Sequence, residues 1–498
     1  MIQMRTIVMK RRAVALLGVG VLALSACAGA GEGGAPSGGG ASDGGSDAGG
    51  DTAPASDRTE VGALSPRIVL AHDGGITTLD SADGSTLSSE DVEGYVRLNP
   101  AGDGRHVAVS ASDTITMYDT GLLAQGHGDH FHYYVQDPAL TDLSLDAPMP
   151  GHVVPHGDRT ALFADGSGEI TVIDPSALGE GDLGVLEETS TADPHHGVAV
   201  PLSDGGLLTT QGTEEARSTV QVLDADGNVT AETDDCPGVH GEAAAQSTES
   251  GDVISLGCEN GPVIYRDGEF HKVAIEGDYQ RSGNQKGHED SPIVLADHKV
   301  QADPAGGAEH PTEIALIDTR DDTMSTVDLG SPYWFRSLDR GPDGEALVLT
   351  ADGELNILDP DTGEMLHEVP VTGEWTEPEN WQEPGPMLDV ADGTAFVVDP
   401  AAQTLTMVDV ASGEIYRELD LPVVPHEIQV TTGTASGEYE VAPGADDGAG
   451  AGDAASDDAA SDGGGEHEDH EDHEDHEGHE HEGHDHGSGD GEHEGHEH

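Results

Sequence analysis

Basic residues are scarce in this sequence. Lys and Arg number 19 among 498 residues, against 98 Asp and Glu, so the formal net charge is −79. This surplus of carboxylates argues strongly against nucleic acid or an anionic membrane surface as a partner, because both are polyanions. A cation is the natural counterpart, although an acidic surface kept for solubility accounts for the bulk of the charge equally well.

Aromatic residues and long apolar runs are also few. Phe, Trp and Tyr make up 3% of the chain while Gly occurs 70 times, so a core must be built from Val, Ile and Leu in alternating runs. The apolar run at 13–24 is too short for a comfortable membrane span. Because Lys10, Arg11 and Arg12 precede it, residues 1–26 are predicted to be a secretory signal peptide.

Cysteine occurs three times, and each one has a predicted role. Residues 24–27 read LSAC, which is typical of a lipobox, so Cys27 is expected to carry a lipid anchor on the extracytoplasmic face of the cell membrane. The alternative is ordinary cleavage beside a chance cysteine. In an oxidising compartment Cys236 and Cys258 are expected to form a disulfide, which is favoured over a pair of thiolate ligands for a soft metal.

Two segments lack the large apolar residues that a packed core needs. Residues 27–65 are rich in Gly, Ala, Ser and Asp, and they are predicted to form a flexible linker between the lipid and the folded part. Residues 433–498 are predicted to form a disordered acidic tail that collects metal ions. The candidate ligands in this tail are His467, His470, His473, His476, His479, His481, His484 and His486.

From residue 66 to residue 432, a pattern of short strands recurs at a spacing of roughly 45 residues. Each repeat has apolar strands, a turn such as Asp-Gly, and a strand that ends in Asp, as in 67–80, 106–119, 160–174, 345–359 and 394–409. The pattern predicts an all-β fold with a single β-propeller, since tandem β-sandwiches would have much longer repeats. Eight blades are favoured and seven are the alternative. The N- and C-terminal strands are expected to complete one blade and close the ring.

The heptapeptide GHGDHFH at 126–132 brings three histidines and an aspartate close together in the chain. Imidazole and carboxylate suit zinc and its neighbours among the transition metals, so His127, His130 and His132 are candidate metal ligands. The other interpretation is a polar surface loop whose histidines bind nothing.

Four histidines fall at one equivalent position of the predicted innermost strands, namely His152, His196, His240 and His426. Innermost strands line the channel of a propeller, so these side chains are expected to converge at one mouth and to bind one metal ion. His426 stands across the ring and reaches the site only if the channel is narrow. His195 and His156 are alternates, and Glu242 or Glu427 could be a carboxylate ligand or could orient an imidazole.

Histidines at this position could instead only hydrogen-bond between neighbouring blades. The segment with GHGDHFH belongs to a connection too long for a simple turn, and such connections are usually functional or disordered. It is expected to fold over the same mouth as the four histidines and to carry metal to or from it.

No catalytic motif competes with a metal site in this sequence. It has no P-loop and no His-Glu-x-x-His, and its Gly-x-Ser-x-Gly match at 40–44 lies in the Gly-rich linker, not at a strand-to-helix elbow. We therefore do not expect an enzyme. The enzyme alternatives are a hydrolase, in which zinc with an open position activates water, and a quinoprotein-like oxidoreductase.

Several short segments together carry a family resemblance: GHGDHFH, PGHVVPHG at 150–157, PHHGVAV at 194–200, CPGVHGEAA at 236–244 and VPHEIQV at 424–430. Over roughly 67–430 the chain resembles the AztD-type zinc metallochaperones. The resemblance implies an extracytoplasmic β-propeller that binds Zn²⁺ and passes it to the solute-binding protein of a zinc ABC importer. It also implies a capture role for His127, His130 and His132, and a channel-mouth site at His152, His196 and His240 with His426 as a further candidate. The lipobox and the long tail depart from the family pattern.

The function predicted from the sequence is that of a surface-anchored zinc metallochaperone. Cu²⁺ or Ni²⁺ would accept the same ligands. The alternative from another class is a propeller scaffold that binds a protein or a glycan and carries a metal-buffering tail. Because histidine must be neutral to bind metal, capture is expected to fail below about pH 6.

Overall fold

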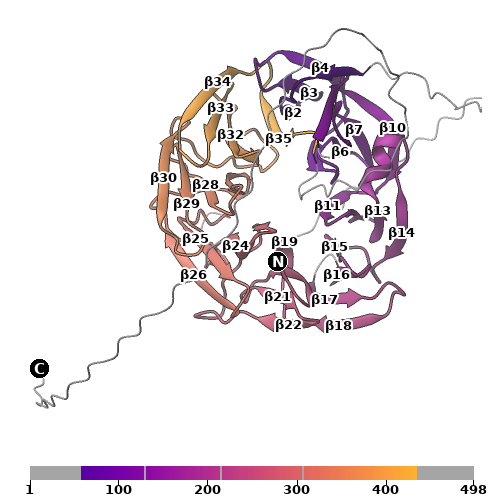
Figure 1. Ribbon diagram of the computed structural model, residues 1–498. Helices are drawn as coiled ribbons and strands as arrows, with labels where there is room; N and C mark the ends of the chain where they lie inside the picture. Colours follow the sequence, from indigo (N-terminus) through magenta and orange to yellow (C-terminus); the bar gives the residue numbers. More distant parts are fainter. Residues whose placement is uncertain (1–57, 128–129, 214–215, 305–307, 435–498) are drawn as a thin grey trace, which may run out of the picture.

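A computed structural model describes residues 58–127, 130–213, 216–304 and 308–434, and the predicted signal peptide, Cys27 and the histidine-rich tail lie outside this part of the chain. Here the chain forms eight four-stranded sheets arranged around a ring (Figure 1). The predicted all-β propeller is therefore confirmed, with eight blades rather than seven. No helix among the described residues is both long enough and apolar enough to cross a membrane.

Each blade is an antiparallel sheet whose strands follow one another from the channel outward. The first blade consists of β5 (Val96–Pro100), β6 (His106–Ala111), β7 (Thr114–Asp119) and β10 (Ala139–Asp146), and the second of β11 (Pro150–His156), β12 (Arg159–Ala164), β13 (Glu169–Ile173) and β14 (Val185–Ser190). The third blade consists of β15 (Ala199–Pro201), β16 (Leu207–Gly212), β17 (Arg217–Leu223) and β18 (Val229–Thr233), and the fourth of β19 (His240–Thr248), β20 (Gly251–Gly257), β21 (Val263–Arg266) and β22 (Glu269–Lys272).

The next three blades continue around the ring, with two short 3-10 helices in the connections, η1 (Pro175–Glu180) after β13 and η2 (Phe335–Ser337) before β27. Their strands are β23 (Gln285–His288), β24 (Ser291–Asp297), β25 (Glu313–Asp318) and β26 (Thr323–Asp328); β27 (Leu338–Arg340), β28 (Ala346–Leu349), β29 (Glu354–Leu358) and β30 (Met365–Pro370); β31 (Met387–Ala391), β32 (Thr394–Asp399), β33 (Thr404–Asp409) and β34 (Ile415–Asp420).

The eighth blade combines both ends of the propeller. Its innermost strand is β35 (Pro425–Thr431), and its other strands are β2 (Arg67–His72), β3 (Gly75–Asp80) and β4 (Thr86–Asp91). Strands β2 and β35 pair from Arg67 opposite Thr431 to His72 opposite Pro425. The predicted pairing of the N- and C-terminal strands is therefore present.

The core consists of aliphatic layers between neighbouring blades. The middle strands of a blade are buried on both faces, as with Leu347 and Leu349 of β28, which cluster with Ala395 and Val408 of the next blade. Outermost strands instead alternate between exposed and half-buried positions. This arrangement explains why a chain with few aromatic rings can still fill a core.

The repeated strand-ending aspartates hold turns. Asp359 Oδ1 accepts a hydrogen bond from the backbone N–H of Thr362, and Asp409 Oδ1 accepts one from Ser412. An aspartate that bonds to the backbone two or three residues onward stabilises a tight turn. The Asp at the end of the third strand therefore starts the turn into the outermost strand.

The ring has two distinct faces. Because every blade repeats the same strand order, each innermost strand begins on one face, here called the start face, and ends on the other, the end face. Connections from the second to the third strand also lie on the start face. Connections from the third to the fourth strand lie on the end face.

One blade contains an inserted hairpin between its third and fourth strands. Strands β8 (Leu122–His127) and β9 (His130–Val135) pair with each other, and β1 (Thr59–Val61) adds to the edge of β9. Residues 59–61, which belong to the predicted flexible linker 27–65, therefore form a short strand. An edge strand such as β9 leaves backbone N–H and C=O groups unpaired, and a short segment rich in β-formers can satisfy them.

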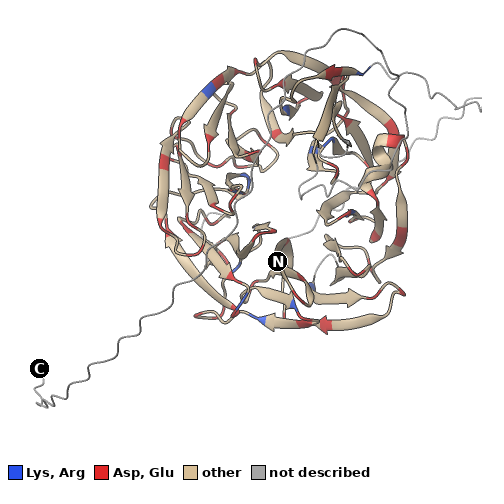
Figure 2. Ribbon diagram, viewed as in Figure 1, with Lys and Arg blue, Asp and Glu red and all other residues tan. Residues whose placement is uncertain are grey.

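Some innermost strands are short. Strand β23 ends at His288 after four residues, and Trp334 precedes η2, which leads into the three-residue strand β27. Short strands near the channel have too few residues for their alternation to define their ends. Figure 2 shows Asp and Glu all around the ring and few Lys or Arg, as the composition predicts.

Candidate metal centre

Three imidazoles from three consecutive blades meet on the start face. His152 is the third residue of β11, His196 lies in the segment leading into β15, and His240 is the first residue of β19. The ring centroid of His152 lies 5.0 Å from that of His196 and 5.6 Å from that of His240, and the centroids of His196 and His240 are 5.1 Å apart. One potential ligand atom from each lies within 4.8 Å of the other two, and no other group of three or more potential ligands in the described residues fits a metal ion.

Each ring is held through its Nδ1 atom by an acceptor oxygen: Glu242 Oε1 at 3.0 Å from His152, Asp165 Oδ2 at 2.6 Å from His196, and the backbone oxygen of Gly283 at 2.6 Å from His240. In each pair the ring Nδ1 donates the proton, so the lone pair of the neutral ring lies on Nε2. Metal-binding histidines are commonly oriented in this way.

A glycine allows the third of these contacts. Gly241 has a backbone φ of +79°, and a Cβ atom there would lie 2.4 Å from the backbone oxygen of Gly283. Only a residue without a side chain lets β19 approach that closely. The sequence pair His240-Gly241 therefore combines the candidate ligand with the irregularity of β19 that positions it.

His152 and His240 differ in how easily they bind a proton. Burial, together with the nearby imidazole of His152, lowers the pKa of His240 to about 3, so this ring is neutral at physiological pH. Burial also lowers the pKa of His152, but the charge and hydrogen bond of Glu242 outweigh that effect and raise its pKa above the ordinary value. Of these two rings, His152 is therefore the one for which a proton competes with a metal up to higher pH.

The group needs only a small adjustment to bind an ion. A tetrahedral zinc ion at about 2.0–2.1 Å from each Nε2 requires these nitrogens to lie about 3.4 Å apart. The side chain of His196 is 39% exposed, against 21% for His152, so it has more room to move as an ion binds. Three protein ligands would leave one position of the ion for a group from another molecule.

Glu242 orients an imidazole, which was one of its two expected roles. Its Oε1 atom faces His152 Nδ1, while its Oε2 atom is buried without a hydrogen-bond partner among the described residues. A carboxylate behind a ligand histidine fixes the ring and raises its basicity.

His426 and His195 do not join the three rings. The Nε2 atom of His426 lies 3.1 Å from the backbone oxygen of Val96 in the next blade, and its ring stacks on Tyr95. His195 is buried, and its two nitrogens lie 3.0 Å from the Asp193 backbone oxygen and from Thr210 Oγ1. His426 thus hydrogen-bonds to the neighbouring blade, which was the alternative interpretation, whereas His195 hydrogen-bonds to the segment before β15 and to β16 of the same blade.

The histidines of GHGDHFH lie on the inserted hairpin. His130 and His132 project from the same side of β9 because side chains alternate along a strand, and their Nε2 atoms are 3.3 Å apart. His132 Nδ1 also lies 2.9 Å from Glu60 Oε1 on β1. The hairpin therefore carries a second group of potential metal ligands. The side chain of His127 and residues 128–129 lie outside what the structure describes.

The hairpin lies on the end face, so the expectation that it folds over the mouth with His152, His196 and His240 is wrong. It follows β7, whose last residue pairs with His106 at the start of β6. Just after the end of β35, the backbone oxygen of Gly433 accepts a hydrogen bond from the backbone N–H of Ala124 in the hairpin. Sequence distance could not reveal this, because the face of a connection depends on which strands it joins.

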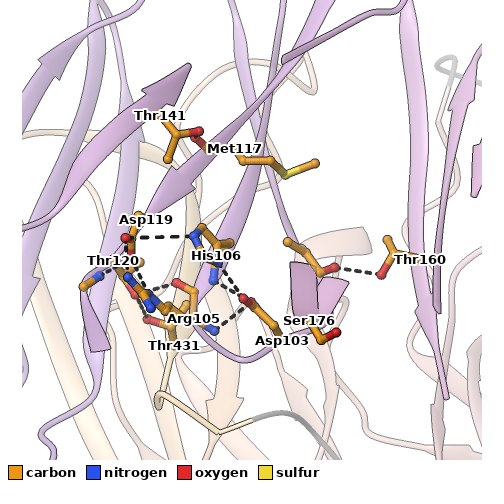
Figure 3. A network of polar contacts seen from close by, with 12 residues as sticks. Asp103, Arg105, His106, Met117, Asp119, Thr120, Thr141, Thr160, Ser176 and Thr431 are labelled. Carbon is orange, nitrogen blue, oxygen red and sulfur yellow. Dashed lines mark hydrogen bonds and ion pairs between the residues drawn. The ribbon is translucent and has the colours of Figure 1, made fainter. Parts of the chain in front are cut away.

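A buried polar network around Asp119 fixes the hairpin to its blade, and Figure 3 shows Asp119 facing Arg105. Asp119 accepts hydrogen bonds from Arg105 at 2.7 and 2.6 Å, from Gly121 N at 2.7 Å and from Gln136 Nε2 at 2.7 Å. Burial would raise the pKa of Asp119, but the hydrogen bond and charge of Arg105 outweigh it and hold the pKa below its usual value. Since Gly121 and Gln136 lie at the two ends of the hairpin, this ionised carboxylate anchors both.

Cys236 and Cys258 form a disulfide in the structure, with Cα atoms 4.8 Å apart. Cys236 precedes the first residue of β19 by four positions, and Cys258 follows the end of β20, where Gly257 pairs with His240. The disulfide therefore joins the segment just before His240 to the end of β20, the strand that pairs with His240.

Some residues around the sites could not be found from sequence. Asp165, Gly283 and Glu60 each orient one histidine, yet each is far from it in the chain. In the sequence nothing distinguishes these residues from the many other acidic residues and glycines of the chain. Tertiary contact alone singles them out.

Comparison with known proteins identifies two kinds of similarity. No family model matches the chain. The zinc chaperone AztD of Citrobacter koseri is 27% identical over 365 residues, which cover 72% of this chain and 84% of that protein. The structure of apo AztD from Citrobacter koseri superposes with a TM-score of 0.62 at 22% identity, over 76% of this chain and all of that one. A second Citrobacter koseri AztD crystal structure gives a TM-score of 0.62 at 23% identity, over 75% and 100%. The resemblance expected from the histidine segments is thus confirmed: in sequence and in fold this chain is similar to the zinc chaperone AztD.

Proposed function

We propose that this protein is a zinc metallochaperone that captures zinc outside the cytoplasmic membrane and passes it to the solute-binding protein of a zinc ABC importer. The observation that carries the proposal is the group of His152, His196 and His240, in which each Nδ1 is engaged by an oxygen and each Nε2 is left for a metal. The similarity to AztD supports zinc as the ion. Cu²⁺ and Ni²⁺ suit the same imidazoles and are the competitors to test.

The chain carries potential metal ligands at separate places, which suits capture of zinc at one place and delivery from another. We place the tight site at the three blade histidines, because rigid strands and hydrogen bonds hold them. His130 and His132 on the hairpin and the histidine-rich tail act as weaker collectors. A lipid on Cys27, after removal of residues 1–26, holds the protein at the extracytoplasmic face of the membrane.

Direct delivery is the test of this function. The zinc-loaded protein, mixed with the metal-free solute-binding protein of a zinc importer and excess chelator, is expected to load the acceptor before the chelator captures the metal. Zinc content of the acceptor after rapid separation measures this, with a zinc salt in place of the protein as control. If the chelator intercepts all the zinc, the protein stores metal and does not deliver it.

The pH dependence of zinc binding should reveal the part played by Glu242. Affinity is expected to decrease as pH falls through the raised pKa of His152, because the proton and zinc compete for that ring. In Glu242→Gln the pKa of His152 is expected to decrease, so the loss of affinity begins at lower pH. At high pH the variant should bind about 10–100-fold more weakly, because the ring is less well oriented.

Dissociation constants measured by chelator competition between pH 5.5 and pH 8.5 would check both effects. Glu188→Gln on the outer strand β14 is a matched control and should follow the wild type. Parallel pH profiles for Glu242→Gln and the wild type would contradict the assigned role of Glu242.

A further inference from the structure

A second feature of the start face is a groove on the blades that precede the three histidines around the ring. It has a volume of about 870 Å³ and lies between the turn after β2, the segment before β5, the segment before β35 and the connection that precedes β31. These are all start-face connections. Since β35, β5 and β11 belong to consecutive blades, the groove borders the part of the ring where the histidine group begins.

The charge of the groove is one-sided. Asp73, Asp91, Glu93 and Glu383 line it, and no Lys or Arg does so among the described residues. All four acidic residues are exposed. Arg97 and Arg336 lie nearby, but both are paired with the buried carboxylate of Glu427.

Apolar groups form much of the remaining lining of the groove. Val92, Pro384 and Val424 contribute to the lining, and the side chain of Val424 is 45% exposed. Carboxylates beside aliphatic walls suit Lys and Arg, whose long stems pack on apolar surface while their charged ends reach an acid.

The walls are held in place before anything binds. The ring of Tyr95 stacks on His426 at 4.6 Å and contacts the edge of Trp381 at 5.2 Å. Arg336 donates hydrogen bonds to Tyr95 Oη at 2.6 Å and to the Trp381 backbone oxygen at 2.7 Å. A preformed groove loses little conformational freedom on binding, which favours recognition.

The occupant must come from another protein. Residues 27–57 and 435–498 contain no Lys or Arg, so neither terminal segment of the mature chain carries the charge that the groove would attract. A second copy of the chain, with a formal charge of −79, is repelled.

We propose that this groove binds a basic, extended segment of a partner protein and so places that partner over the start face beside His152. That the partner is the one that exchanges zinc with the histidine group rests on the proposed function, whereas the docking does not. Attraction between acidic and basic surfaces speeds encounter and fixes orientation.

The test uses the full-length protein and a fluorescent eight-residue peptide in which Lys alternates with Leu and Ala, followed by anisotropy. The groove variant is Asp91→Asn/Glu93→Gln/Glu383→Gln. A matched variant, Glu188→Gln/Glu414→Gln/Glu418→Gln, removes the same charge from outer strands and turns. The groove variant should bind the peptide about tenfold more weakly and with less salt dependence, and the matched variant within about twofold of wild type.

Equal affinities for the two variants would overturn the proposal, because the attraction would then be due to net charge and not to the groove. A peptide with Gln in place of Lys should not bind, and its binding would also overturn it. His152→Ala/His196→Ala should keep peptide affinity while losing the tight zinc site and keeping only the weaker zinc binding of the tail, so a failed docking surface and a failed metal site give different results.

Discussion

Alanine in place of His152, His196 or His240 is expected to lower the zinc affinity of the propeller by at least about a hundredfold. Loss of a group that only orients a ligand costs about 10–100-fold, and loss of the ligand itself should cost no less. The effect should be large for each of the three, because two imidazoles alone leave half of a tetrahedral ion to solvent.

The measurement is a zinc titration against a competing chelator on protein that ends after Thr434, so that the tail histidines do not mask the site. His367→Ala, on the outer strand β30, is the control and should bind zinc as the wild type does. His426→Ala should also retain the tight site, because the structure keeps that ring apart from the other three. Unchanged affinity in all three single variants would refute the proposed site.

Removal of the disulfide is expected to lower the free energy of unfolding by about 3 kcal/mol. The bond closes a loop with a sequence separation of 22 residues, and its loss gives the unfolded chain more freedom. Both sulfurs are buried in a cluster with Val239 and Leu256, so Cys236→Ala/Cys258→Ala avoids placing a hydroxyl there.

Urea unfolding of the wild type and the double variant, both free of metal, would measure this difference. A reductant should destabilise the wild type and leave the variant unchanged, which serves as the internal control. A difference below about 1 kcal/mol would show that the surrounding strands, and not the covalent bond, hold the start of β19. Zinc affinity of the folded variant should also decrease, because the disulfide clamps both sides of His240.

The candidate metal ligands lie on two opposite faces of the ring, and this affects how zinc captured on one face would reach the other for delivery. The hairpin with His130 and His132 and the last described residues, near Gly433, lie on the end face. His152, His196 and His240 lie on the start face. The hairpin is therefore a separate donor group rather than a cover for the blade histidines, and transfer between the two groups would have to cross or go around the ring.

Much of this molecule follows from local sequence. The strand alternation and the Asp-ending repeats predicted a propeller, because period-two burial and turn capping act over a few residues. The common position of His152, His196 and His240 in their repeats predicted that they meet, because equivalent positions on neighbouring blades must lie close together. Oxidation of Cys236 and Cys258 followed from their number and the predicted compartment.

Other features depend on contacts between residues far apart in the chain, which only the tertiary structure decided. His426 occupies the same position in its repeat, yet its blade is two places from β11, so it stacks on Tyr95 instead. Glu60 reaches His132 only because β1 adds to the hairpin, and the hairpin lies on the end face only because it joins a third strand to a fourth. Repeats determine what each blade looks like, whereas the order of blades around the ring determines which of their side chains can share one ion.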